Sequence, residues 1–230
     1  MTPFLLIPGL NCDARVYVPA TEALWPFGPV TIANHRDGDG VAGIARAILA
    51  AAPPRFALVG FSMGGYIAFE ILRQASERVS RLALLDTSAR PDPAEAIENR
   101  RRRMALASAG KFGLAVEQSF PNSVHPENLD NSRLYSIHRA MAEANGPETY
   151  VRQQQAIIDR PDSRPGLAAI AVPTLIVVGE GDQITPPDAA GEMHAGIAGS
   201  RLVVIPRAGH LALLEDSAAV NAALRQWAAD

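Results

Sequence analysis

The sequence predicts an α/β fold: a doubly wound, mostly parallel sheet of about six strands with helices on both faces. Short, nearly continuous apolar segments recur along the chain, and segments with helical spacing lie between most of them. Continuous apolarity, rather than alternation, is what a parallel strand covered on both faces requires. The strand–helix alternation favours the doubly wound class. One long segment breaks the alternation and predicts a helical insertion.

The strand-like segments are about four residues long and end at Gly, Pro or a charged residue. They are Phe4–Ile7, Val30–Ala33, Phe56–Val59, Leu82–Leu85, Leu175–Val178 and Leu202–Ile205. Apolar residues at helical spacing predict three helices between or after these strands. The predicted helices are Val41–Ala52, Gly64–Glu77 and Ala218–Ala228.

Residues 87–171 contain no convincing strand. Proline and glycine breakers divide this segment into about three or four helices, with the clearest periodicity in Leu129–Ala144 and Glu148–Ile158. A connection this long is usually functional, for example as a lid over a site. We therefore expect a core formed by residues 1–86 and 172–230, with residues 87–171 inserted in it as a helical cap.

Composition excludes several classes of protein. The net charge of −3 over 230 residues gives no electrostatic case for binding nucleic acid or an anionic membrane. Cys12 is the one cysteine, so neither an internal disulfide nor a four-cysteine zinc site can form. Phe4–Ile7 lacks the basic flank of a secretory leader, and no apolar segment approaches the roughly 20 residues of a membrane span. We expect a cytoplasmic protein and leave its oligomeric state open.

Four consecutive arginines, Arg100–Arg103, suggest a phosphate or nucleic-acid site. Consecutive helical residues point in different directions, however, and Glu98 and Arg102 have the i,i+4 spacing of a surface ion pair. We therefore expect an exposed, solvated helix here.

Gly60–Gly64 fits the G-x-S-x-G pattern. It follows one predicted strand and opens a predicted helix, the context in which this pattern presents a nucleophilic serine on a strained turn. Ser62 is then the nucleophile. The glycines on either side are needed because a Cβ there would collide with the neighbouring strand or helix. The Met63 amide, at the helix N-terminus, can donate to a developing oxyanion.

A serine nucleophile requires a base. His210 follows the last strand, at the same sheet edge as Ser62, and is the predicted base. His35 also follows a strand, but nothing nearby in the sequence orients it. The other three histidines are expected to be structural or exposed; they are His125, His138 and His194.

The base requires a carboxylate that fixes its tautomer. Asp182 follows the strand Leu175–Val178, and the chain order Ser62, Asp182, His210 is the order of α/β-hydrolases. Asp86 and Glu180 are the competing acids. We favour Asp182 because the turn after it fixes its loop.

A second oxyanion donor should come from another loop at this edge. Pro8 and Gly9 end the first strand, so the Leu10 amide is the natural candidate, although a plain turn would also suit these residues. The coincidence of four loops at one sheet edge favours catalysis.

With these residues assembled, the sequence resembles the α/β-hydrolase superfamily, specifically its small-cap group of carboxylesterases and enol-lactonases. The resemblance is carried by Leu6–Asn11, Gly60–Gly65, Pro173–Pro186 and Ala208–Glu215. It implies the same roles for Ser62, Asp182, His210, Leu10 and Met63. The sequence departs from the family in having Pro8-Gly9 where His-Gly is usual, and in lacking the first two strands of the family sheet.

The resemblance implies a serine esterase acting on small, largely apolar substrates through an acyl-enzyme, with no metal or organic cofactor. Serine at position 62 argues against activities that need a carboxylate nucleophile. Hydrolysis of a lactone or a carbon–carbon bond, cofactor-free perhydrolysis, and a receptor-like module with a slow triad remain alternatives. The expected pocket residues in the cap are Phe120, Leu134, Tyr135, His138 and Tyr150.

Overall fold

The computed structural model describes residues 1–230 and contains one sheet of six parallel strands in the order β2-β1-β3-β4-β5-β6. The predicted α/β class and strand number are confirmed. The strands are β1 (Phe4–Ile7), β2 (Val30–Ile32), β3 (Phe56–Phe61), β4 (Val79–Leu85), β5 (Thr174–Gly179) and β6 (Arg201–Ile205).

Several strands are longer than their apolar segments. β4 begins at Val79, and its next residues, Ser80 and Arg81, are only partly buried. Arg81 donates a hydrogen bond to the Trp227 carbonyl at 2.9 Å, which satisfies one of its donors at the end of the sheet. Apolarity alone misses such residues because they lie where the strand reaches the surface.

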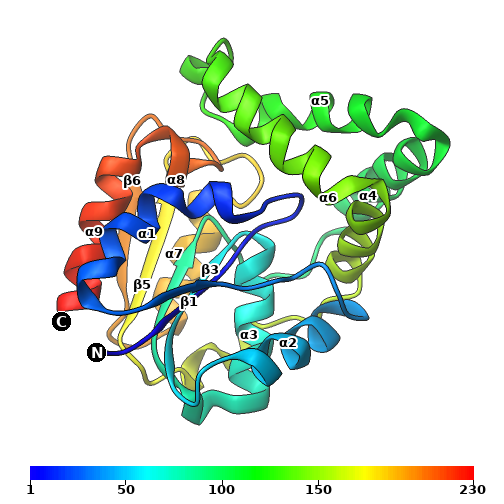
Figure 1. Ribbon diagram of the computed structural model, residues 1–230. Coiled ribbons are helices and arrows are strands. Elements are labelled where there is room, and N and C mark those ends of the chain that lie inside the picture. The colour runs from blue at the N-terminus through cyan, green and yellow to red at the C-terminus, as the bar shows by residue number, and fades with distance from the viewer.

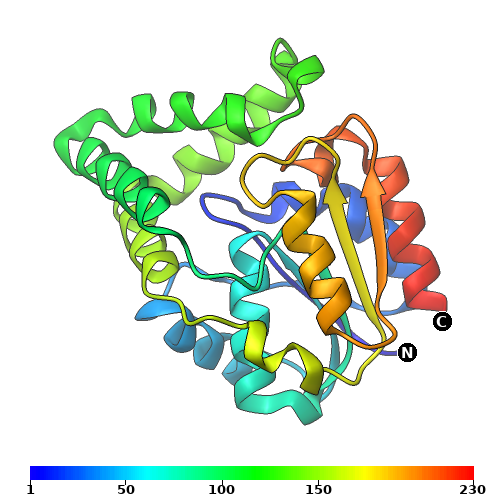
Figure 2. The same ribbon diagram turned by 180° about the vertical axis from the view of Figure 1, so that it is seen from behind.

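Helices cover both faces of the sheet (Figures 1 and 2). The helices are α1 (Val18–Leu24), α2 (Gly40–Ala51), α3 (Met63–Ala75), α4 (Ala94–Leu106), α5 (Phe112–Ser123), α6 (Ser132–Ile158), α7 (Pro187–Gly196), α8 (Ala212–Glu215) and α9 (Ser217–Ala229). α1, α8 and α9 pack on one face, and α2, α3 and α7 on the other. None of these helices is long and apolar enough to cross a membrane.

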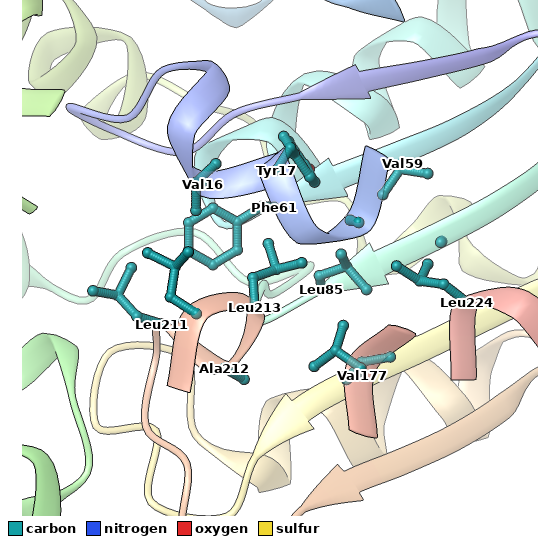
Figure 3. Close-up of a cluster of buried hydrophobic side chains, with 14 of the residues drawn as sticks. Val16, Tyr17, Val59, Phe61, Leu85, Val177, Leu211, Ala212, Leu213 and Leu224 are labelled. Atoms are coloured by element: carbon teal, nitrogen blue, oxygen red, sulfur yellow. The ribbon is translucent and has the colours of Figure 1, made fainter. Parts of the chain in front are cut away.

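Two hydrophobic clusters flank the sheet, because successive strand residues point to opposite faces. In β3, Val59 and Phe61 belong to the cluster under α1, α8 and α9, whereas Leu58 belongs to the cluster under α2 and α3. Figure 3 shows the first cluster, with Leu85 and Val177 of neighbouring strands facing the same helices. Burial on both faces explains why the strand sequences are continuously apolar.

The segment between β4 and β5 forms the helical insertion, which contains α4, α5 and α6 and lies beyond the carboxyl ends of the strands (Figure 1). It contains no strand, as predicted. Gly146, with φ 79°, interrupts α6, so the two helices expected on either side of the Asn145-Gly146-Pro147 breaker are two arms of one bent element. Both chain ends lie on the opposite side of the molecule from this insertion (Figure 2).

Candidate active site

Ser62 lies between β3 and α3, where the chain reverses direction abruptly. Its φ of 52° and ψ of −116° are unusual for a residue with a side chain, and such strain persists only where surrounding contacts enforce it. The Ser62 amide donates to the Leu85 carbonyl at 3.0 Å, and the Ser62 carbonyl accepts from the Thr87 hydroxyl at 2.7 Å. The end of β4 therefore holds the serine turn from both sides.

Close backbone approach explains the two flanking glycines. A Cβ on Gly60 would lie 2.5 Å from the Gly64 carbonyl oxygen, and a Cβ on Gly64 would lie 2.0 Å from the Ile7 carbonyl oxygen. Both separations are far inside van der Waals contact. The steric requirement expected from the sequence pattern is therefore present. Because Gly60 and Gly64 have no side chain, β1, β3 and α3 can meet around Ser62.

A continuous chain of hydrogen bonds joins Ser62, His210 and Asp182. Nε2 of His210 is 2.8 Å from Oγ of Ser62, and Nδ1 of His210 is 2.8 Å from Oδ2 of Asp182. All three residues are buried. With the imidazole proton on Nδ1 donating to Asp182, Nε2 is free to accept the serine proton. The loops after β3, β5 and β6 thus bring together a serine, an aspartate and a histidine in one hydrogen-bonded chain.

Asp182 is held as a carboxylate. Burial raises its pKa, but electrostatic attraction to the His210 ring and hydrogen bonds from His210 and Thr185 outweigh burial, so its pKa lies below the usual value. Oδ1 accepts from the Ile184 and Thr185 amides at 2.8 and 3.0 Å, and Oδ2 accepts from the Thr185 hydroxyl at 2.8 Å. The turn after Asp182 therefore fixes the carboxylate, and Thr185 is a supporting residue that the sequence did not single out.

Neither competing acid hydrogen-bonds His210. Oδ1 of Asp86 accepts from the Gly179 amide at 2.8 Å, which ties β4 to β5. Burial, with the nearby negative charge of Asp182, raises the pKa of Asp86 well above its usual value. Glu180 is exposed and accepts a hydrogen bond from the Arg207 amide at 3.2 Å.

The other histidines make different contacts. His125 and His138 belong to the insertion and bond to the Glu127 amide and the Ser119 hydroxyl, and exposed His194 bonds to Ser200. His35 is buried, and its Nε2 lies 2.8 Å from the Gly9 carbonyl oxygen. Burial lowers the pKa of His35 to about 4. A neutral ring therefore donates to Gly9 and supports the loop after β1.

That loop carries Leu10, whose amide makes no hydrogen bond within the chain. Met63 is the first residue of α3, and its amide has no carbonyl one turn earlier in that helix to bond to. Asn11, with φ 61°, donates its amide to Oε1 of Gln153 at 3.0 Å. Gln153 comes from α6, so the insertion and His35 together hold the loop. No sequence signal identified Gln153, because its role depends on how α6 packs.

A cavity of about 520 Å³ lies beside Ser62 and His210, lined by residues of both the core and the insertion. Leu10 lines it, as do two of the expected pocket residues, His138 and Tyr150. The other three do not, which corrects the prediction. Phe120 and Leu134 are instead buried in the hydrophobic cluster shared with α1, α8 and α9, and the Tyr135 ring packs edge-on against Phe120.

The cavity lining is more polar than the apolar pocket expected from the sequence. Ten of its 29 residues are hydrophobic, and Arg100 and Arg103 are among the others. These two arginines are three residues apart and share one face of α4. Arg102 instead pairs with Glu98 at 3.5 Å on the exposed face, as predicted. The arginine run is therefore only partly solvated, and half of it faces the cavity.

Comparisons with known proteins agree with this geometry. The family model described as the alpha/beta hydrolase fold matches residues 41–217. A pimeloyl-[acyl-carrier protein] methyl ester esterase of Neisseria meningitidis serogroup B is 27% identical, over 96% of this chain and 91% of its own. The AB hydrolase superfamily protein YisY of Bacillus subtilis is 35% identical, over 74% of this chain and 65% of its own.

Among solved structures, a thermophilic esterase from Thermogutta terrifontis with malate bound superposes with a TM-score of 0.88. It is 31% identical, and the match covers 99% of this chain and 89% of the esterase. The enol-lactonase from Burkholderia xenovorans LB400 shares the fold, with a TM-score of 0.87 at 21% identity. The match covers 100% of this chain and 92% of the lactonase.

Proposed function

The chain belongs to the α/β-hydrolase family, and we propose that it is a serine esterase that cleaves carboxylic esters through an acyl-enzyme. One observation carries the proposal: the unbroken hydrogen-bond chain from Ser62 through His210 to Asp182, with the serine on a strained turn. A fold alone does not determine an activity, whereas these three side chains in this order have defined chemical roles.

The proposed reaction begins when Oγ of Ser62 attacks the ester carbonyl carbon and Nε2 of His210 takes the hydroxyl proton. The amides of Leu10 and Met63 donate to the negatively charged carbonyl oxygen. His210 then gives the proton to the departing alcohol, which leaves an acyl group on Ser62. Water, deprotonated by His210, attacks the acyl-enzyme and releases the carboxylic acid. Asp182 stabilises the imidazolium formed in each step.

Residues 87–171 are proposed to act as a cap over this site. The cavity wall is formed jointly by the insertion and the core, and Gln153 of α6 bonds to the amide of Asn11 beside the proposed oxyanion donor. The insertion would therefore shape the substrate pocket and brace the loop that carries Leu10.

The names of the relatives support an ester as the substrate. The Neisseria meningitidis relative is named for a methyl ester, and the Thermogutta terrifontis structure is described as an esterase. Both matches extend over nearly the whole of this chain. We therefore place carboxylic esters ahead of lactones.

A fluorophosphonate probe tests the proposal because it reacts covalently only with an activated serine. We expect the wild-type protein to be labelled at Ser62, Ser62→Ala to be unlabelled, and His210→Ala to be labelled far more slowly. Ser76→Ala removes an exposed serine at the other end of α3 and should be labelled like the wild type. Equal labelling of Ser62→Ala and the wild type would contradict the assignment.

A further inference from the structure

The cavity beside Ser62 carries positive charge for which the proposed hydrolysis has no use. Its charged lining residues are four arginines and one aspartate: Arg90, Asp92, Arg100, Arg103 and Arg160. A simple neutral ester offers no partner for such a lining. The balance of these charges therefore indicates what else the cavity binds.

Arg90 is neutralised outside the cavity. Its guanidinium bonds to Asp188 at 2.8 Å and to Glu192 at 2.7 Å, and both acids lie on α7. Neither acid lines the cavity. Arg90 therefore contributes no unbalanced charge.

Asp92 is shared by two arginines. Its Oδ1 accepts from Nη2 of Arg160 at 2.7 Å, and its Oδ2 pairs with Nε of Arg100. Burial raises the pKa of Asp92, but the two guanidinium groups outweigh burial and lower it, so Asp92 is a carboxylate. One negative charge faces two positive charges, and the side chains of Asp92 and Arg160 are only 8% and 5% exposed. One positive charge remains unbalanced in a largely buried place.

Arg103 adds a second unbalanced charge. It lines the cavity, is half-buried, and makes no hydrogen bond or ion pair within the chain. Arg100 is held beside it, because its Nη1 donates to Oε1 of Gln154 at 2.7 Å, and Gln154 in turn donates to the Tyr150 hydroxyl at 2.8 Å. Arg100 is thus fixed in place, and Arg103 has all its donors free.

Tyr66 connects this charged wall to the nucleophile. It lies on the first turn of α3, directly after the serine turn, and lines the same cavity as Ser62. The Arg160 guanidinium carbon lies 4.1 Å from the centre of its ring. Tyr66 is buried, lines the cavity, and its hydroxyl has no hydrogen-bond partner within the chain. Its hydroxyl is therefore free to donate a hydrogen bond.

We propose that the cavity binds an ester that carries a separate anionic group, a carboxylate or a phosphate, and that Arg103 and Arg100 hold this group while Ser62 attacks the ester carbonyl. The inference rests on the proposed esterase function and narrows its substrate class. Arginine has the planar fork of donors that matches both kinds of anion. An anionic ligand also neutralises guanidinium groups that are otherwise costly to bury.

Matched substrates test this proposal. Monomethyl adipate carries a carboxylate, and dimethyl adipate has the same chain without the charge. A methyl ester ending in a phosphonate provides the phosphate-like arm. We expect the wild type to have a kcat/KM at least about tenfold higher for an anionic ester than for the neutral one, as hydrogen bonds to charged groups allow. Preference for the carboxylate or the phosphonate arm identifies the anion.

Variants on α4 locate the subsite. Arg103→Ala should lower the ratio of kcat/KM for the anionic ester to that for the neutral ester by about tenfold or more. Arg101→Ala is the matched control, because Arg101 is exposed on the same helix and does not line the cavity. Its ratio should equal that of the wild type. Equal thermal unfolding midpoints for the two variants would show that the effect is not a loss of fold.

Two results would overturn the proposal. The first is a wild type that is labelled at Ser62 and hydrolyses dimethyl adipate yet shows no preference for either anionic ester. In that case the esterase function stands and the anion subsite is wrong. The second is an anionic preference that survives Arg103→Ala and Arg100→Ala alike. A protein that is not labelled at Ser62 would instead contradict the esterase function itself, and the subsite with it.

Discussion

Two regions meet at the cavity. Ser62, Asp182 and His210 come from core loops that directly follow parallel strands, whereas Arg100 and Arg103 come from a helix of the insertion. The core residues are placed by short connections to a rigid sheet, within 2.8 Å of one another along the chain of hydrogen bonds. The insertion residues are placed by helix packing alone. The comparison suggests that the core provides the chemistry and the insertion selects the substrate.

The two regions also differ in how much change they tolerate. A Cβ on Gly64 of the core would meet backbone at 2.0 Å, while a Cβ on Gly113 of the insertion would meet nothing within 4 Å. Substitutions near the serine turn should therefore damage both fold and activity, and those on the insertion should change specificity. The following predictions test that contrast, from the largest expected effect to the smallest.

Asp182→Asn should reduce kcat for a short-chain ester by about 10⁴, because an amide stabilises the wrong imidazole tautomer. Glu180→Gln is the matched control, since Glu180 is an exposed carboxylate two residues away that contacts a backbone amide. Steady-state kinetics of both variants distinguish the two acids. A loss of similar size in Glu180→Gln would move the acid role to that residue.

Gly64→Ala should lower the free energy of unfolding by about 3 kcal/mol or more, because the new methyl group forces the β1 backbone away from α3. Gly113→Ala, inside α5 with open space around it, should instead raise stability by about 0.5–1 kcal/mol through helix propensity. Urea denaturation measures both. If both variants changed stability by the same amount, the contrast between core and insertion would be lost.

His35 should make stability depend on pH. Its pKa is about 4 in the folded protein and 6.5 in the unfolded chain. At a pH between these two values, the unfolded chain therefore carries more of the proton than the folded protein does. The stabilisation from the neutral ring is present above pH 6.5 and is lost as the pH falls towards 4. The free energy of unfolding should fall by at most about 1.4 kcal/mol per pH unit, and by about 3 kcal/mol over the whole window.

The stability difference between the wild type and His35→Asn should therefore shrink across this pH window. Unfolding curves at a series of pH values measure the difference. His194→Asn, which changes an exposed histidine, serves as the control. A wild-type minus His35→Asn difference that stays constant from pH 7 to 4 would contradict the buried, neutral ring.

Thr185→Val should reduce kcat by roughly tenfold, because it removes a 2.8 Å hydrogen bond to the Asp182 carboxylate while keeping the side-chain shape. Thr149→Val is the corresponding change in the insertion, where the hydroxyl accepts only a 3.3 Å hydrogen bond from Arg152. That variant should retain the wild-type kcat. The same ester assay measures both, and equal kcat values for the two variants would remove Thr185 from the supporting role.

The residues at the sheet edge could be predicted from sequence because their positions depend on short, local sequence patterns. Ser62 sits in a G-x-S-x-G turn between a strand and a helix, and the carboxyl ends of parallel strands necessarily meet at one edge. Position after a strand therefore predicted that His210 and Asp182 lie near Ser62, and the turn after Asp182 distinguished it from Asp86 and Glu180. Their hydrogen bonds follow from the fold, and their catalytic roles remain a proposal.

The insertion could not be predicted in the same way. Arg103 and Phe120 both belong to helices, but which face of each helix turns to the cavity depends on how α4, α5 and α6 pack together, and no sequence period encodes that. Gln153 reaches Asn11 only because α6 bends at Gly146 and packs against the core. The short α1 was also missed, because its seven residues, Val18–Leu24, are too few to show a helical period.

The central claim is that Ser62 and His210 act as one catalytic unit, and a double variant tests it most directly. Ser62→Ala, His210→Ala and the double variant should each lose on the order of 10⁴–10⁶ in kcat, with the double variant no more than about threefold below the worse single variant. Multiplied losses in the double variant, or near-normal turnover by Ser62→Ala, would contradict the account.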